Sequence, residues 1–312
     1  MSSAVTGLCL VEPAAFGFNA GTAGTNRFQQ RPAGLDASAA AAAARAEFHT
    51  LVGALSARGI PLAIAADTPE PPKPDAVFPN NWVSFHADGT VVLYPMYDPA
   101  RRAERREPVI QQVKRQLGFV ERRRFDLSSE ERSGRFLEGT GSLVLDHQHR
   151  IAYACRSPRT DPGLLAEWAR LMGYETFLFD AATRDGVPVY HTNVVMWLGS
   201  RIAGVGLEWV AAEHRAALAD RLRATGRELL PLADAQLHDF AGNMLQVDGA
   251  GQRHLLMSAR AAASLDAPQR RQIAQAGLQP VTAALPVIEQ LGGGSIRCMV
   301  AEVPLAAGES AT

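Results

Sequence analysis

The chain has 312 residues, 47% apolar and 20% charged, which is typical of a globular protein with a full-sized core. Its 31 basic and 32 acidic side chains leave a net charge of −1, which argues against binding to nucleic acid or to a membrane surface. No apolar run reaches the roughly 18 residues of a membrane span, and the first residues do not follow a signal-peptide pattern. Three cysteines form no disulfide framework. We therefore expect a cytoplasmic protein with a single domain, residues 1–312.

Five stretches carry the start and stop signals of helices, and each closes at a glycine. They span residues 36–58, 99–118, 161–173, 208–225 and 266–277. In the second stretch, Pro108 predicts an internal break. In the third, Asp161 is the expected N-cap and Pro162 the first helical residue.

A short apolar run follows each helix, and a polar or glycine-rich turn then leads into a second run that enters a hairpin. The first runs are 60–65, 119–127, 174–179, 228–232 and 278–284. The turns are 78–81, 137–141, 190–193, 241–243 and 292–298. Each unit is therefore expected to hold one helix and about three strands.

The turns recur at a nearly constant spacing. The markers Asn80, Glu138, His191, Asn243 and Cys298 follow one another after 58, 53, 52 and 55 residues, and Asn19 lies 61 residues before the first. A period of 50–60 residues predicts structural repeats, and repeats that close into a ring would bring the turns together. The alternative is a mixed α/β chain in which this spacing has no meaning.

Three of the markers are the residue types of thiol catalysis. Cys298 could act as a nucleophile, which needs a base or an electropositive setting. His191 could transfer protons, and Glu138 could fix the tautomer of its ring. Spacing alone leaves the alternative that Cys298 is a small buried apolar residue and His191 a hydrogen-bonded core residue.

Six motifs in order resemble the pentein superfamily of guanidine-modifying enzymes, which contains arginine deiminases, dimethylarginine dimethylaminohydrolases and amidinotransferases. They are PDAVFPNNWVSF (74–85), ARRAE (100–104), LEGTGSLVL (137–145), CRSPRTD (155–161), YHTNV (190–194) and GGGSIRCM (292–299). The resemblance implies a five-bladed α/β propeller of helix–strand–strand units, which agrees with the repeat.

Roles follow from the resemblance by matched position. It implies that Cys298 is the nucleophile, His191 the general acid and base, and Glu138 their acidic partner. Arg101 and Arg159 would bind the α-carboxylate of the substrate, a task that suits a planar guanidinium. Asp75 would lie near the α-amino group. Other residues expected to line the centre are Phe78, Asn19 and Asn243.

Three asparagines depart from the family pattern. Asn80 and Asn81 stand where dimethylargininases have Glu-Asp, and Asn193 stands where arginine deiminases have an aspartate. A buried guanidinium without a matching negative charge is costly, whereas an amide can both donate to and accept from a neutral ureido group. The chain also resembles a bacterial branch of citrulline hydrolases, which shares FGFN (16–19) and FPNNW (78–82). We therefore expect hydrolysis of L-citrulline to ornithine, ammonia and carbon dioxide.

Other functions remain open at this stage. The chain could hydrolyse or deiminate arginine or methylated arginine, with Glu138 facing the cation, or it could transfer an amidino group. It could also be a binding protein that keeps the propeller without catalysis. No cofactor or metal is expected, because the DHQH segment (146–149) is typical of a hairpin turn. The expected partner is a small amino-acid substrate, and a homodimer is conceivable.

Overall fold

The computed structural model describes residues 6–31 and 36–305. Residues 1–5, which are part of the start of the chain where no signal peptide is expected, lie outside the described residues. Five three-stranded sheets form the molecule, and in each the central strand pairs antiparallel with one neighbour and parallel with the other. The sheets are β15 (Ala301–Pro304), β1 (Thr6–Glu12), β2 (Leu62–Ala66); β3 (Val83–Phe85), β4 (Thr90–Leu93), β5 (Arg123–Asp126); β6 (Val144–Asp146), β7 (Ile151–Cys155), β8 (Glu175–Phe179); β9 (Met196–Leu198), β10 (Ile202–Val205), β11 (Glu228–Pro231); and β12 (Leu245–Gly249), β13 (Gln252–Ser258), β14 (Leu278–Ala283).

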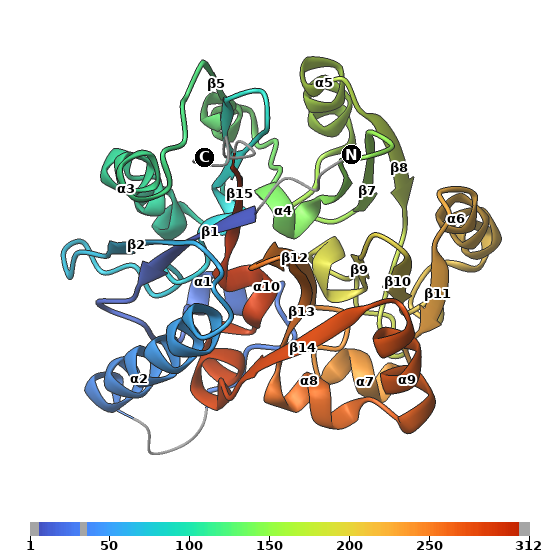
Figure 1. Ribbon diagram of the computed structural model, residues 1–312. Helices are drawn as coiled ribbons and strands as arrows, with labels where there is room; N and C mark the ends of the chain where they lie inside the picture. The colour runs from blue at the N-terminus through green and yellow to red at the C-terminus, as the bar shows by residue number, and fades with distance from the viewer. Residues whose placement is uncertain (1–5, 32–35, 306–312) are drawn as a thin grey trace, which may run out of the picture.

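The sheets follow one another around a centre (Figure 1). Strand β15 lies against β3, β6 against β9, β9 against β12, and β12 against β1. The remaining contact joins β3 to α4 (Gly139–Ser142), the short helix that leads into β6. These contacts close a ring of five units, as the repeat predicts. Because β1 and β15 share a sheet, Asn19 belongs to the same unit as Cys298 and marks no sixth repeat.

Five helices form the outer layer of the ring (Figure 1). They are α2 (Ala37–Ser56), α3 (Glu107–Leu117), α5 (Pro162–Met172), α6 (Ala212–Ala224) and α9 (Ala267–Gln275). Each packs against the outer strand of a sheet: α3 on β2, α5 on β8, α6 on β11, and both α2 and α9 on β14. The side chains of Asp36, Asp161 and Asp266 cap three of the N-termini, as is common for this residue type.

Two predicted helix boundaries are wrong. The stretch 99–118 holds two helices, the 3-10 helix η2 (Pro99–Glu104) and α3, and Pro108 lies in the first turn of α3 instead of breaking it. Proline fits there because the first N–H groups of a helix have no partner within it. Helix α6 begins at Ala212, four residues later than predicted, because the backbone N–H of Ala211 bonds to Asp180 outside the helix.

The remaining helices are short, and several stand directly before an inner strand. The full set is α1 (Ala20–Ala23), η1 (Pro79–Asn81), η3 (Ser128–Ser133), η4 (Thr192–Val194), α7 (Asp234–His238), α8 (Ala259–Ser264), η5 (Ile288–Gly292) and α10 (Ile296–Met299). Elements η1, α4, η4 and α10 lead into β3, β6, β9 and β15. Since α4 touches both η1 and η4, and α10 touches η1, the predicted turns meet at the centre of the ring.

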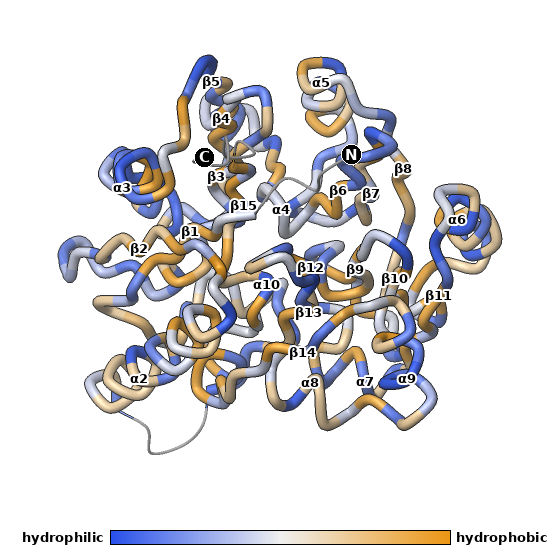
Figure 2. Tube along the Cα trace, viewed as in Figure 1, coloured by the Kyte–Doolittle hydropathy of each residue, from blue (hydrophilic) through white to orange (hydrophobic). Residues whose placement is uncertain are grey.

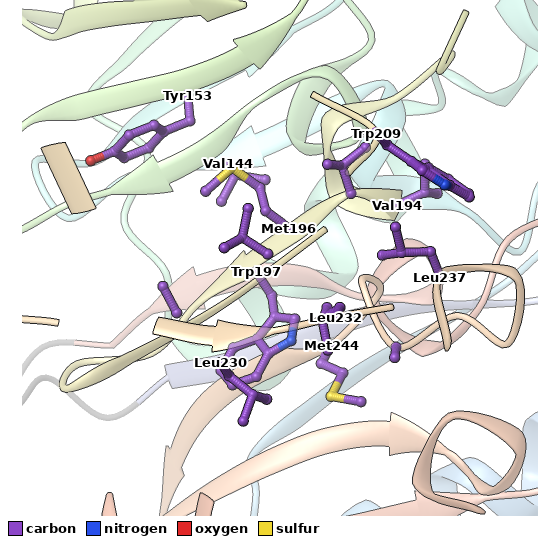
Figure 3. Close-up of a cluster of buried hydrophobic side chains, with 14 of the residues drawn as sticks. Val144, Tyr153, Val194, Met196, Trp197, Trp209, Leu230, Leu232, Leu237 and Met244 are labelled. Carbon is purple, nitrogen blue, oxygen red and sulfur yellow. The ribbon is translucent and has the colours of Figure 1, made fainter. Parts of the chain in front are cut away.

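Hydrophobic residues are frequent in the strands near the centre, while outer helices such as α3 and α6 contain many hydrophilic residues (Figure 2). One cluster packs Trp197, Trp209, Met196 and Met244 between neighbouring units (Figure 3). Trp197 lies so close to Gly204 that a Cβ there would come within 2.1 Å of the indole nitrogen. This packing fixes β9 and therefore the turn that carries His191.

No helix within residues 6–31 and 36–305 has both the length and the apolar character that crossing a membrane requires.

Candidate active site

The Cys298 thiol lies at the centre of the ring, in α10, and its residue is 3% exposed. The side-chain amides of Asn243 and Asn193 donate to its Sγ over 3.3 Å and 3.5 Å. Burial raises the pKa of this thiol, and the hydrogen bond from Asn243 opposes the shift. The resting sulfur is therefore protonated at neutral pH, and attack on a substrate requires a base.

His191 is paired with Glu138 across two units of the ring. Its Nε2 lies 2.8 Å from Glu138 Oε2, and because the carboxylate can only accept, the proton of the neutral ring is on Nε2. Burial lowers the pKa of His191 to about 4, against the opposing effect of Glu138. Although burial also disfavours the charged carboxylate, Arg159 and His191 hold the pKa of Glu138 well below its usual range. A neutral imidazole with a free Nδ1 is thus available as a base.

Gly141 allows the His191 ring to lie where it does. A Cβ at Gly141 would come within 2.7 Å of His191 Nδ1 and within 2.5 Å of Asn81 Nδ2. Gly141, the second glycine of the LEGTG turn, is therefore required for steric reasons, since any larger residue would displace both polar groups.

Cys298 and His191 line one narrow pocket, whose water-accessible volume is about 10 Å³. Of the predicted substrate residues, Asp75, Phe78, Asn81, Arg101 and Arg159 line it as well. Five further residues line the pocket but were not among the predicted site residues: Thr22, Asn26, Tyr190, Gly292 and Gly294.

One side of the pocket is charged, and we call Asp75, Arg101 and Arg159 the charged half. Asp75 Oδ2 accepts a hydrogen bond of 2.8 Å from Asn19 and lies 3.6 Å from Arg101 Nε. Asp75 Oδ1 is buried without a partner. Because buried polar atoms are almost always paired, an unpaired carboxylate oxygen in a pocket is suited to a ligand that donates.

The two arginines of the charged half are held differently. Arg101 donates two hydrogen bonds of 2.9 Å to Glu104 and a third to Asn81 Oδ1, so most of its donors are used. Arg159 donates to Thr25, to the Thr22 carbonyl and, over 3.4 Å, to Glu138 Oε2. Its guanidinium also lies over the ring of Tyr190, and its Nε has no partner. Arg159 is therefore the freer of the two for an anion.

Four buried asparagines, Asn80, Asn81, Asn193 and Asn243, form what we call the amide half. Of these, Asn81 lines the pocket, and Asn193 and Asn243 contact the sulfur. Asn81 Nδ2, Asn193 Oδ1 and both side-chain atoms of Asn80 are buried without partners. Asn243 is fully used, since it donates to the Asn193 carbonyl and accepts from the backbone N–H of Arg297. Asn243 thus holds the nucleophile turn, whereas Asn81 and Asn193 have free hydrogen-bonding capacity near the sulfur.

The predicted residues that do not line the pocket each touch one that does, or stand beside it. Glu138 supports His191, Asn19 supports Asp75, and Asn193 and Asn243 contact the sulfur. Asn80 lies in the turn before β3, where its carbonyl accepts from Thr140.

Two supporting residues were missed by the sequence analysis. Glu104 is 3% exposed and anchors Arg101, and it stands within the ARRAE motif one turn after that arginine. Tyr190 precedes His191 and donates to the Gly293 carbonyl over 2.6 Å. The contact of Glu104 with Arg101 is local, but the sequence does not show that it is buried, and nothing near Tyr190 indicates its contact with Gly293.

The other two cysteines are unlike Cys298. Burial raises the pKa of Cys9 and of Cys155 to about 12, and neither lines the pocket. In the DHQH turn, Asp146 pairs with His149 and Arg227. Within the described part of the chain, no three His, Cys, Asp or Glu side chains gather as metal ligands would.

Comparison with known proteins places this geometry in a family. The sequence profile of N,N dimethylarginine dimethylhydrolase, eukaryotic, matches residues 12–305. No curated protein matches the chain in sequence.

Solved structures share the fold at low identity. Unliganded AgrE superposes with a TM-score of 0.74 at 16% identity, over 98% of this chain and 40% of AgrE. The N-terminal domain of ArgZ, an arginine dihydrolase from the ornithine-ammonia cycle in cyanobacteria, gives 0.73 at 16% identity, over 96% of this chain and 98% of that domain. A dimethylarginine dimethylaminohydrolase adduct with S-methyl-L-thiocitrulline gives 0.62 at 13% identity, over 96% and 99% of the two chains. The chain therefore has the pentein fold of the guanidino hydrolases and belongs to the N,N dimethylarginine dimethylhydrolase family.

Proposed function

We propose that the chain hydrolyses the ureido group of L-citrulline through a covalent intermediate on Cys298, giving ornithine, ammonia and carbon dioxide. One observation carries this proposal: Asp75 is the one carboxylate in the pocket lining that the structure describes, while amides surround the sulfur. The pocket thus has charges for an amino-acid group and neutral groups for the reacting carbon.

The charged half suits the α-amino and α-carboxylate groups. The free Oδ1 of Asp75 would accept from the α-ammonium, and the free Nε of Arg159 would donate to the α-carboxylate. Both side chains are buried, so a ligand without these charges would leave Asp75 Oδ1 and Arg159 Nε without a hydrogen-bond partner. This arrangement favours a free amino acid over a peptide or an amine without a carboxylate.

The amide half suits a neutral head group. Asn81 Nδ2 could donate to the ureido carbonyl, and Asn193 Oδ1 could accept from a ureido N–H. A guanidinium at the same place would bring a positive charge, and no carboxylate in the pocket lining remains for it once Asp75 holds the α-ammonium.

Attack would begin from a neutral thiol and a neutral imidazole. As the sulfur bonds to the ureido carbon, the thiol proton passes to His191, whose charged form Glu138 stabilises. Asn81 and the amides beside the sulfur are placed to stabilise the developing oxyanion.

Breakdown would use the same histidine in reverse. The protonated His191 gives its proton to the departing amine, which leaves a thiocarbamate on Cys298. His191 then takes a proton from water as the water attacks that carbon, and it passes this proton to the sulfur as the carbon–sulfur bond breaks, which restores the neutral thiol and imidazole. Carbamate released in this way separates into ammonia and carbon dioxide.

A guanidino substrate is the second candidate, because the fold neighbours include an arginine dihydrolase and a dimethylarginine dimethylaminohydrolase. In that reading Glu138 faces the cation. Its two oxygens are already occupied, however: Oε1 accepts from the Tyr97 N–H, and Oε2 is shared by His191 and Arg159. This occupancy favours the ureido substrate.

A substrate panel tests the proposal. Citrulline, arginine, methylarginines and agmatine are supplied separately, and ornithine, citrulline, ammonia and methylamines are measured, since hydrolysis of a methylarginine to citrulline releases a methylamine. We expect citrulline to have the highest kcat/KM. Ornithine from arginine with none from citrulline would establish the guanidino reading instead, and no covalent labelling of Cys298 by any substrate would favour a binding protein.

A further inference from the structure

A buried carboxylate that the reaction scheme does not use stands directly before the nucleophile turn (292–298). Glu289 lies in η5 and is 3% exposed, and it does not line the catalytic pocket. Burial raises the pKa of Glu289, and hydrogen bonds from Ser258 and Ser295 oppose the shift. Because a buried carboxylate is costly unless its oxygens are used, the groups that it holds indicate its role.

The Glu289 carboxylate holds the side chain of Ser295. Ser295 Oγ donates to Glu289 Oε1 over 2.7 Å, and both residues are buried. Ser295 stands at the N-cap position of α10, where a serine hydroxyl usually accepts from the first N–H groups of the helix. It makes no such bond here, and Asn243 Oδ1 accepts from the backbone N–H of Arg297 instead. The hydroxyl of Ser295 is therefore committed to Glu289.

The backbone of Ser295 contacts the nucleophile in two ways. Its carbonyl accepts from the backbone N–H of Cys298 over 2.9 Å and from that of Met299 over 3.3 Å. A backbone hydrogen bond from Ser295 also lowers the pKa of the Cys298 thiol, against the larger effect of burial. A donor at the sulfur stabilises the thiolate, so the position of this backbone affects how readily the sulfur becomes nucleophilic.

The turn between Glu289 and Ser295 has little restraint of its own, because residues 292–294 are all glycine. Gly293 has a φ of +62°, and a Cβ on the first or the last of the three would come within 2.8 Å or 3.0 Å of the Phe78 ring. The close approach of Phe78 thus excludes larger residues. Glu289 spans this flexible run, since its carbonyl accepts from the Gly293 N–H over 3.0 Å and its carboxylate from Ser295.

We propose that Glu289 is a positioning residue for the nucleophile: by holding the hydroxyl of Ser295, it keeps the backbone of Ser295 against Cys298, so that a donor is in place when the thiolate forms. Glu289 acts only through Ser295. The inference rests on the part of the proposed function that makes Cys298 the nucleophile, and it is independent of the choice between citrulline and arginine.

Alkylation of Cys298 by iodoacetamide measures the nucleophilicity of the sulfur without any substrate. The sulfur bonds to the methylene carbon, iodide leaves, and the thiol proton passes to solvent. At a fixed neutral pH, the rate constant followed by mass spectrometry is proportional to the thiolate fraction. A merely structural loss acts in the opposite direction, since a loosened turn exposes the thiol and removes the burial that raises its pKa.

Three substitutions separate the hydroxyl, the acceptor and the charge. Ser295→Ala removes only the hydroxyl, and Glu289→Leu removes the acceptor at similar volume. Both should lower the alkylation rate constant about fivefold, which corresponds to one neutral hydrogen bond. The rate constant for formation of the covalent intermediate with substrate should fall by the same factor, with KM unchanged. Glu289→Gln keeps an oxygen acceptor and should restore most of the rate.

Ser84→Ala is the matched control. Ser84 is also buried, and its hydroxyl bonds to His86 and Tyr94 in another unit of the ring. Its thermal unfolding should shift at least as much as that of Ser295→Ala, while the alkylation rate constant stays at the wild-type value. Ser295→Ala decides the test if Glu289→Leu does not fold.

An unchanged or faster alkylation of Cys298 in Ser295→Ala would overturn the positioning role. Alkylation as slow in Glu289→Gln as in Glu289→Leu would do the same, because the acceptor would then not be what matters, and so would an equal loss in Ser84→Ala. Failure of citrulline turnover counts against the proposed function alone, since alkylation needs no substrate.

Discussion

The charged half and the amide half of the pocket are built from the same ring of turns but differ in what they leave free. In the charged half, Arg101 is held by Glu104 and Asp75 by Asn19, so the geometry of the charges is fixed before a ligand arrives. In the amide half, Asn81 and Asn193 keep unpaired atoms beside the sulfur. The difference separates two tasks, because fixed charges recognise the amino-acid end and free amides recognise the reacting group.

Removal of the nucleophile is expected to have the largest effect. Cys298→Ala should reduce turnover at least about 1,000-fold while substrate still binds, because both halves remain. Steady-state kinetics and intact-protein mass spectrometry measure the rate and the covalent intermediate. Cys155→Ala is the control, since that thiol does not line the pocket. A similar loss of turnover in Cys155→Ala would show that the effect of Cys298→Ala comes from lower stability and not from the missing nucleophile.

Weakening the charged half should act mainly on binding. Arg159→Gln removes the freer guanidinium, and the loss of a charged hydrogen bond worth about 1.5–3 kcal/mol corresponds to a rise in KM of roughly 10- to 100-fold. Because Arg159 also lies 3.4 Å from Glu138 Oε2, the oxygen that holds His191, kcat should fall as well, but by less than KM rises. A fall in kcat with KM unchanged would place Arg159 at the reacting group instead.

A charge placed in the amide half should change specificity. Asn193→Asp sets a carboxylate beside the sulfur, which should lower kcat/KM for citrulline and improve that for arginine, shifting their ratio by about tenfold or more. Asn193→Ala is the matched control, because it removes the amide without adding charge and should lose citrulline turnover with no gain for arginine. Asn81→Asp should shift the ratio less, since Arg101 lies 2.9 Å from that side chain. Unchanged citrulline kinetics in both aspartate variants would contradict the assignment of the amide half to a neutral head group.

The lowered pKa of His191 should have a smaller effect than these substitutions, and this effect appears in the pH dependence of kcat/KM. With a pKa of about 4, His191 stays neutral well below its ordinary range, so the acid limb of kcat/KM should fall only as pH approaches 4. An acid limb near pH 6.5 would contradict the buried, neutral imidazole.

The same shift affects stability. Because the folded pKa lies below the unfolded value of about 6.5, the unfolded chain binds more protons between about pH 6.5 and 4. Stability is therefore full above this window and declines as the pH falls through it. Urea unfolding should show a smaller decline in His191→Gln than in the wild type, because His86, whose pKa burial lowers to about 3, still contributes to the decline in both.

Much of the fold is predictable because its signals are local. Asp161 caps a helix and Gly173 ends it, and both act within a few residues of the backbone they satisfy. The late start of α6 is not predictable in this way, because a tertiary bond from Ala211 to Asp180 decides it.

The same distinction between features that the sequence shows and features that depend on the folded structure applies to the site. The repeat brings Glu138, His191 and Cys298 to one centre, and their residue types indicate the chemistry. Glu104 was missed because the sequence does not show that its i,i+3 pairing with Arg101 is buried beside the pocket. The hydrogen bond from Asn193 to the Cys298 sulfur likewise depends on the folded structure, because the two residues lie in different units of the ring.

Binding of citrulline and arginine to the Cys298→Ala variant tests the central claim most directly, since the two ligands share the amino-acid end and differ in the charge of the head group. Calorimetry at neutral pH should give a Kd for citrulline lower than that for arginine by about tenfold or more. Equal affinities, or tighter binding of arginine, would contradict the assignment of the amide half to an uncharged ureido group.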